Sequence, residues 1–557
     1  MVSLVNQLPA GRNGGLQGGR EPGLVSSRSR LPNLGAVTDQ ILAVWTDPWV
    51  LHALGCEHLD VAFCDERTAV LTCWHGARSY HVKLVRCCGQ RFYPRSERDW
   101  HKRLWPTASG WDMDDLSADA RGAFARTWTD DRPWEFLTAL TSIGDRMAGG
   151  EGDSRASSLV ANAFADAGVE AVEFDPFEMA RWTRGETTLE LTAPDERSFD
   201  AVALPYAPAV DVSGPLVDVG YGTPSEIDDC DVDGGIAVAS TTTPGDGRFV
   251  HRMEKFNYAI DSGALGFVFV NHVPGQLPPT GALRYDEVAV APGVGVSKET
   301  GAWLTDYAER NGTARLSVSA ATTPGESRNV EGHLGPDTER ELVFCAHFDA
   351  HDIAEGALDN GCGIATVVTA ARLLAAMDLD LGVRVVGVGA EELGLTGAEH
   401  LVRRLDLDRV AAVVNVDGAG RFRDLVAMSH TSEATADVAT RVADETRHPI
   451  RVEETPHPFS DQWPFVRAGV PALQLHSDSG ERGRGWGHTH ADTRDKVDVR
   501  NIREHAMLAA LLVRELASAA AADELSRLDA DELAGAFRRA DFATGMKAAG
   551  IWPDGWE

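Results

Sequence analysis

The sequence contains little lysine and no long apolar run. Six of its 557 residues are lysine, so the 52 basic residues are nearly all arginine, against 84 acidic residues and a net charge of −32. Nucleic acids and anionic membranes are bound through clusters of basic residues, so neither is expected as a partner. No run of 18 apolar residues exists, and the N-terminus lacks the pattern of a secretory signal. We therefore expect a soluble, cytoplasmic protein.

The excess of acidic residues extends along most of the chain rather than forming a tail. At molar salt the Debye length falls to about 3 Å, so neighbouring carboxylates tolerate one another and keep a crowded protein soluble. This composition predicts a protein from a halophile.

Residues 1–112 differ in composition from the rest. This segment is slightly basic and contains five of the eight cysteines, and no helical or strand periodicity is sustained in it. Its cysteines lack the Cys-x-x-Cys pairs of a zinc ribbon. We expect residues 1–112 to be disordered or not natively translated, with Met113 as an alternative start.

The remaining chain predicts an α/β fold with an insertion. After residue 334, apolar strand patterns at 342–346, 383–388, 410–416 and 471–475 alternate with helical patterns, which indicates a mixed, mostly parallel sheet sandwiched by helices. We assign 113–204 and 321–520 to this domain. Residues 205–320 contain short strand patterns at 236–239, 265–270 and 288–296 around one helical pattern at 252–264, and predict a small β-rich insertion. Residues 521–557 predict a helical tail.

Possible metal ligands follow the expected strands. His347 and Asp349 follow the first strand, Glu391 and Glu392 the second, and Asp417 the third. Sites in such sheets form outside the carboxyl ends of the strands, so these side chains are expected to meet.

Two loops add further candidates. Asp359 lies in Leu-Asp-Asn-Gly-Cys-Gly, and His488 lies in His-Thr-His-Ala-Asp-Thr. Imidazoles mixed with carboxylates suit catalytic Zn²⁺, with water completing the coordination.

These motifs together resemble those of the co-catalytic dinuclear zinc aminopeptidases, metallopeptidase family 28. The resemblance covers about residues 134–518 and implies a zinc-exopeptidase-like fold. The insertion resembles a protease-associated domain, and residues 1–112 resemble nothing in the family.

The resemblance implies two Zn²⁺ ions, with Co²⁺ or Mn²⁺ as alternatives. It places His347 and Asp417 on one ion and Glu392 and His488 on the other. Asp359 then bridges the two ions, and the resemblance also implies a cis peptide bond between Asp359 and Asn360.

The adjacent glutamates are expected to have different roles. Neighbouring residues point in different directions, so one coordinates while the other moves protons. The resemblance makes Glu391 the general base, and Asp349 is suited to accept the second N–H of the His347 imidazole.

Three further residues near these motifs have open roles. His488 fits the family pattern better than His490, which is a surface residue or lines the site. Gly487 replaces a tyrosine that stabilises the oxyanion in several relatives, so the oxyanion donor is undetermined. Cys362 replaces a common serine and is expected to be a packed residue, because a nucleophilic thiol needs an activating neighbour.

The expected reaction is hydrolysis of the N-terminal peptide bond of a peptide substrate, through a metal-held water and the Glu391 base. A carboxypeptidase or dipeptidase on the same scaffold is the main alternative and would use an arginine such as Arg421, Arg423 or Arg484. A one-metal glutaminyl-cyclase-like transferase and a non-catalytic binding relative are less favoured. Side-chain specificity and oligomeric state are not predicted.

Overall fold

The structure is a computed structural model of the whole chain. It describes four strands within residues 2–85, and residues 116–556 except 246 and 481–484. The chain divides into two compact units, Met1–Thr107 and Ala108–Glu557. Each unit is described by itself.

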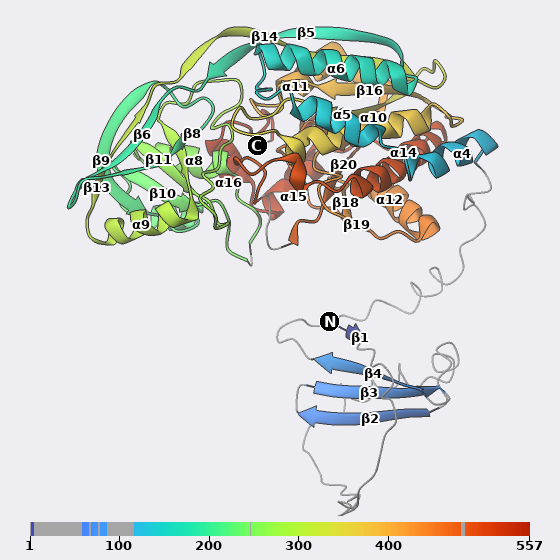
Figure 1. Ribbon diagram of the computed structural model, residues 1–557, viewed down its shortest axis with the longest axis horizontal. Coiled ribbons are helices and arrows are strands. Elements are labelled where there is room, and N and C mark those ends of the chain that lie inside the picture. Colours follow the sequence, from blue (N-terminus) through green and yellow to red (C-terminus); the bar gives the residue numbers. More distant parts are fainter. Residues whose placement is uncertain are drawn as a thin grey trace, which may run out of the picture. The chain divides into compact units, whose positions relative to one another are not determined.

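The first unit contains an antiparallel sheet in the order β1-β4-β3-β2 (Figure 1). Its strands are β1 (Val2–Leu4), β2 (His58–Asp65), β3 (Thr68–His75) and β4 (Arg78–Val85). The sequence shows no sustained periodicity in this segment, yet these four strands form in it. In β2 the apolar residues Leu59, Val61 and Phe63 alternate with other residues, but the pattern is too short to predict a strand by itself. The strand forms by antiparallel pairing with β3. The rest of the expectation for 1–112 lies outside the described residues.

The second unit is built on an eight-stranded mixed sheet. The strand order is β19-β18-β20-β17-β15-β16-β14-β5, and the central strands β20, β17, β15 and β16 are parallel. The bounds are β5 (Glu170–Thr183), β14 (Ala321–Leu334), β15 (Glu341–His347), β16 (Gly382–Val388), β17 (Val410–Val416), β18 (Leu425–Met428), β19 (Ile450–Glu453) and β20 (Ala472–Ser477).

The two faces of this sheet bury different cores. Successive side chains of a strand point to opposite faces. In β15, Leu342 and Phe344 join one apolar cluster, whereas Val343 and Cys345 join another. This burial on both faces explains why the strand appears in the sequence as a continuous apolar run.

Helices cover both faces of the sheet (Figure 1). The first core includes side chains of α4 (Ala118–Thr127), α5 (Arg132–Thr141), α6 (Glu151–Ala167), α10 (Cys362–Leu374), α12 (Glu433–Thr446) and α14 (Val499–Ala521). The other core includes side chains of α11 (Thr396–Arg404), α13 (Trp463–Arg467), α15 (Ala530–Arg539) and α16 (Ala543–Ala548). No helix within the described residues is both long and apolar enough to span a membrane.

A second eight-stranded sheet is inserted between β5 and β14. Its order is β7-β6-β13-β9-β10-β11-β12-β8, and it has its own apolar core. Residue Thr183 at the end of β5 pairs with Ala321 at the start of β14, so the chain enters and leaves the insertion through one antiparallel ribbon. The elements are β6 (Thr187–Ala193), β7 (Arg197–Phe199), β8 (Val202–Ala203), β9 (Val210–Asp218), α7 (Pro224–Asp228), β10 (Ile236–Ser240), α8 (Arg252–Asp261), β11 (Gly266–Val270), β12 (Gly293–Val296), α9 (Lys298–Glu309) and β13 (Thr313–Val318).

Three details of the insertion differ from the sequence expectation. Its sheet includes β6, β7 and β8, which precede residue 205. Strand β12 begins only after Pro292, which lacks an N–H for the ladder, and Val290 is exposed. Helix α9 was missed because Gly301 interrupts its pattern, yet a Cβ there would lie 2.1 Å from the Val270 side chain. Glycine therefore permits close packing of α9 on the sheet.

Candidate active site

The carboxyl ends of the central strands bring the expected residues together. In the parallel pair β15 and β16, His347 is level with Val388, and β17 lies on the other side of β15. The loops that follow these strands therefore open at one edge of the sheet. His347, the Glu391-Glu392 pair and Asp417 all lie at this edge.

His347, Asp359 and Asp417 form the first group of possible metal ligands. All three are buried, and one donor atom from each lies within 4.8 Å of the others. His347 Nε2 is 3.5 Å from Asp359 Oδ1 and 4.0 Å from Asp417 Oδ1. These separations are compatible with donor atoms directed at one ion rather than bonded to one another.

The loop that carries Asp359 is held at several points. Asp359 lies in the irregular helical turn η2 (Ala357–Gly361), and its peptide bond to Asn360 is cis, as expected. The Asp492 carboxylate accepts the N–H groups of Leu358 and Asp359 at 2.6 and 3.0 Å. The Asn360 amide donates to the Val416 carbonyl at 2.8 Å, which ties this loop to the residue before Asp417.

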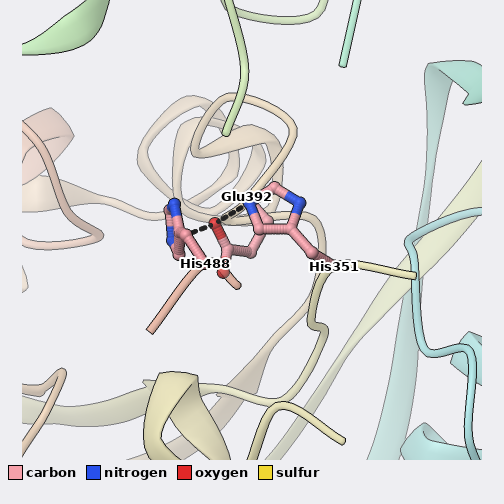
Figure 2. Close-up of side chains that lie close together, drawn as sticks. All are labelled: His351, Glu392 and His488. Atoms are coloured by element: carbon pink, nitrogen blue, oxygen red, sulfur yellow. Dashed lines mark ion pairs between the residues drawn. The ribbon is translucent and has the colours of Figure 1, made fainter. Parts of the chain in front are cut away.

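The second group consists of Glu392, His488 and His351 (Figure 2). Glu392 Oε2 lies 3.0 Å from His488 Nε2 and 2.9 Å from His351 Nε2. His488 Nε2 is also 3.1 Å from Asp359 Oδ2, so Asp359 contacts both groups. Although burial alone would raise it, the neighbouring imidazoles hold the pKa of Glu392 well below its usual range.

Glu391 faces the first group without belonging to it. Its Oε2 lies 4.0 Å from His347 Nε2, and its side chain is 12% exposed. The N–H groups of Glu391 and Glu392 donate to the two oxygens of the Asp349 carboxylate at 3.1 and 3.2 Å. His347 Nδ1 is 3.3 Å from Asp349 Oδ1 and from the Asp349 carbonyl oxygen. Asp349 thus orients the imidazole and both glutamates.

The sequence did not indicate how three residues at this edge are placed. His351 has no motif of its own, and its only signal is its place four residues after His347. Arg421 was expected only as a possible binder of a substrate carboxylate, but its Nη2 lies 2.7 Å from Asp359 Oδ1 and 3.1 Å from Asp417 Oδ1. Asp461 is fully buried with no hydrogen bond to either carboxylate oxygen. Burial, together with the charges of Asp349, Asp417 and Glu392, raises the pKa of Asp461 to about 8.

The donor set fits divalent cations. Three imidazoles and three carboxylates converge in a buried region, and buried charges of one sign are costly unless they are paired or bind a metal. His347 Nε2 and Glu392 Oε1 are buried and make no hydrogen bond. Such orphaned donor atoms are expected where an ion completes their bonding. Mixed nitrogen and oxygen ligands suit Zn²⁺.

The structure also places the three residues whose roles the sequence leaves undetermined. His490 is exposed, and its Nδ1 lies 2.8 Å from the Ile353 carbonyl oxygen. Cys362 is fully buried, its Sγ contacts the Leu358 carbonyl at 3.3 Å, and burial raises the pKa of its thiol to about 12. Gly487 and His488 line a cavity of about 290 Å³ whose other walls are mostly insertion residues.

Comparison with known proteins identifies both domains. Residues 329–513 match peptidase family M28, and residues 212–304 match the PA domain. The M28 match includes every residue of the two candidate ligand groups. The chain is therefore a metallopeptidase with a PA domain inserted in its catalytic domain.

Individual proteins show this similarity in sequence or in fold. Aminopeptidase YwaD of Bacillus subtilis is 26% identical over 387 residues, which cover 67% of this chain and 82% of the relative. The structure of a peptidase M28 precursor from Shewanella amazonensis shares the fold at a TM-score of 0.61, with 21% identity over 72% of this chain and 96% of that one. BSAP, a zinc aminopeptidase from Bacillus subtilis, has a TM-score of 0.54, with 24% identity over 72% of this chain and 95% of that one.

Proposed function

We propose that this M28 peptidase is a zinc-dependent aminopeptidase that binds two ions and uses Glu391 as its general base. The observation that carries the proposal is the pair of donor groups that share Asp359, with the Glu391 carboxylate beside them. His347, Asp359 and Asp417 would hold one ion, and Asp359, Glu392 and His488 the other. The relatives named as aminopeptidases support the same reaction.

Two bound Zn²⁺ ions would supply Lewis acidity and activate a water for attack on the scissile carbonyl. Glu391 takes a proton from the attacking water and passes it to the departing amine. Asp349 keeps the Glu391 backbone and the His347 ring in place for this transfer. Cys362 takes no part, because its thiol is buried and protonated at neutral pH.

The surroundings of the site favour a free amino terminus on the substrate. A protonated α-amino group is attracted by a region rich in carboxylates, which here includes Glu391, Glu392 and Asp359. The adjoining cavity between the catalytic domain and the insertion offers room for substrate side chains. Among the arginines weighed for a carboxypeptidase, Arg421 already contacts the Asp359 and Asp417 carboxylates, and Arg423 is exposed. Arg484 lies outside the described residues.

The test compares substrates that differ at one terminus. The purified chain is stripped with a chelator, reloaded with Zn²⁺, Co²⁺ or Mn²⁺, and assayed with free and N-acetylated aminoacyl peptides. We expect hydrolysis of the free peptides only, and activity that requires reloading. Release of C-terminal residues from acetylated peptides would favour the carboxypeptidase alternative, and no hydrolysis by the loaded protein would refute the proposal.

A further inference from the structure

We propose that His351 is an additional protein ligand of the ion held by Asp359, Glu392 and His488. This inference rests on the proposed metal pair. It gives that ion four protein ligands and leaves the other ion with three.

The distances place His351 in the group. Glu392 Oε2 lies between the two imidazoles, 2.9 Å from His351 Nε2 and 3.0 Å from His488 Nε2 (Figure 2). Donors about 2.0–2.1 Å from one Zn²⁺ in tetrahedral geometry are roughly 3.3 Å apart. The rings of His351 and His488 are nearly perpendicular, with centroids 4.5 Å apart, so both nitrogens face the same carboxylate without stacking.

The alternative is that His351 is only a hydrogen-bond partner of Glu392. The contact has the length of a hydrogen bond, but the other ring nitrogen, Nδ1, is buried and has no hydrogen-bond partner. The imidazole is 4% exposed, so water does not readily supply one. A hydrogen bond to Glu392 would explain His351 alone, whereas a shared ion explains why the Nε2 atoms of both His351 and His488 lie against the same carboxylate oxygen.

The backbone around His351 is fixed from outside the site. The buried Arg146 side chain donates to the Phe348 carbonyl at 3.1 Å, the Gly356 carbonyl at 3.0 Å and the Glu355 carbonyl. These bonds hold both ends of the loop that carries His351. The imidazole is therefore presented to the site by a fixed loop.

The added ligand makes the two ions unequal. Four protein ligands close a tetrahedral shell, which is typical of structural zinc, whereas three ligands leave a position for water or substrate. The ion bound by His351 would then be retained more strongly, and the ion bound by His347, Asp359 and Asp417 would have one protein ligand fewer.

The experiment measures metal binding rather than activity alone. The full chain is compared with His351→Gln, which removes the imidazole, and with His351→Glu, which restores a ligating group of similar reach. His333→Gln is the matched control, because His333 is 45% exposed on β14. Zinc content after dialysis against a competing chelator and the absorption spectrum of the Co²⁺-loaded proteins are recorded.

We expect two ions in the full chain and in His333→Gln. His351→Gln should lose one ion. Its affinity should fall at least about 100-fold, the upper end of the loss caused by removing an indirect partner of a metal, and the Co²⁺ spectrum should change. His351→Glu should recover part of the affinity. If His351→Gln does not fold, His351→Ala should show the same loss.

Two results separate the inference from the proposed function. Two ions bound with unchanged affinity and an unchanged Co²⁺ spectrum in a folded His351→Gln protein would overturn the role of His351 and leave the proposed function intact. Fewer than two ions in the unmodified chain would overturn the metal pair itself.

Discussion

The adjacent glutamates provide the most direct test of the site. Glu392 Oε2 touches two imidazoles and is buried, whereas Glu391 Oε2 lies 4.0 Å from His347 and its side chain is partly exposed. Glu391→Gln keeps the size of the side chain but removes the base. We expect unchanged zinc content and a kcat lower by about 10²–10⁴, which corresponds to about 2.7–5.5 kcal/mol in the barrier.

Glu392→Gln is expected to act through the metal instead. A neutral amide is a poorer ligand than a carboxylate, so the ion between His351 and His488 should bind more weakly. Excess Zn²⁺ should partly restore the activity. Elemental analysis of the dialysed proteins, together with kinetics at high salt, distinguishes the two variants.

Glu399→Gln is the matched control, because Glu399 lies on α11 and its carboxylate pairs with Arg467 at 2.6 Å. This ion pair includes no residue of either ligand group, so the kinetics and zinc content of Glu399→Gln should be unchanged. Zinc loss in Glu391→Gln with two ions kept in Glu392→Gln would reverse the assignments. Normal hydrolysis by both variants would refute the proposed mechanism.

Four further outcomes are expected. Cys362→Ser should retain activity, and thiol reagents should not inhibit the folded protein; rapid inhibition traced to Cys362 would contradict its buried, protonated state. Burial lowers the pKa of His430 to about 3, so its contribution to stability is present above its unfolded value near 6.5 and is lost as the pH falls below that value. Between pH 6.5 and 5 the free energy of unfolding should therefore fall by about 1.6 kcal/mol more in the unmodified protein than in His430→Gln, and denaturant titrations that give parallel pH dependences would exclude this. Arg146→Met should lower stability by about 3 kcal/mol, because three carbonyls lose a donor, and an unchanged denaturant midpoint would count against that role. A chain that begins at Met113 should keep full activity and thermal stability, and loss of either would make residues 1–112 an integral part of the enzyme.

The sequence alone determined the architecture of the catalytic domain and most of the candidate site. Strands buried on both faces are continuous apolar runs, and helices are amphipathic or apolar at helical spacing, so β15, β16 and β17 were recognisable. The rule that sites form at the carboxyl ends of parallel strands then pointed to His347, Glu391, Glu392 and Asp417. Short strands such as β2 and the glycine-interrupted α9 were not recognisable, because their local signals are weak and they depend on pairing and packing partners.

Only the tertiary structure decided how these side chains are grouped. His351 has no motif of its own, and its link to Glu392 and His488 arises because three separate loops meet at one edge of the sheet. Arg421 likewise gained its position from the turn after β17, where its guanidinium reaches Asp359 and Asp417. Local sequence specifies which residues follow a strand, but distances between loops depend on strand order and register. Those are set by the packing of the whole sheet.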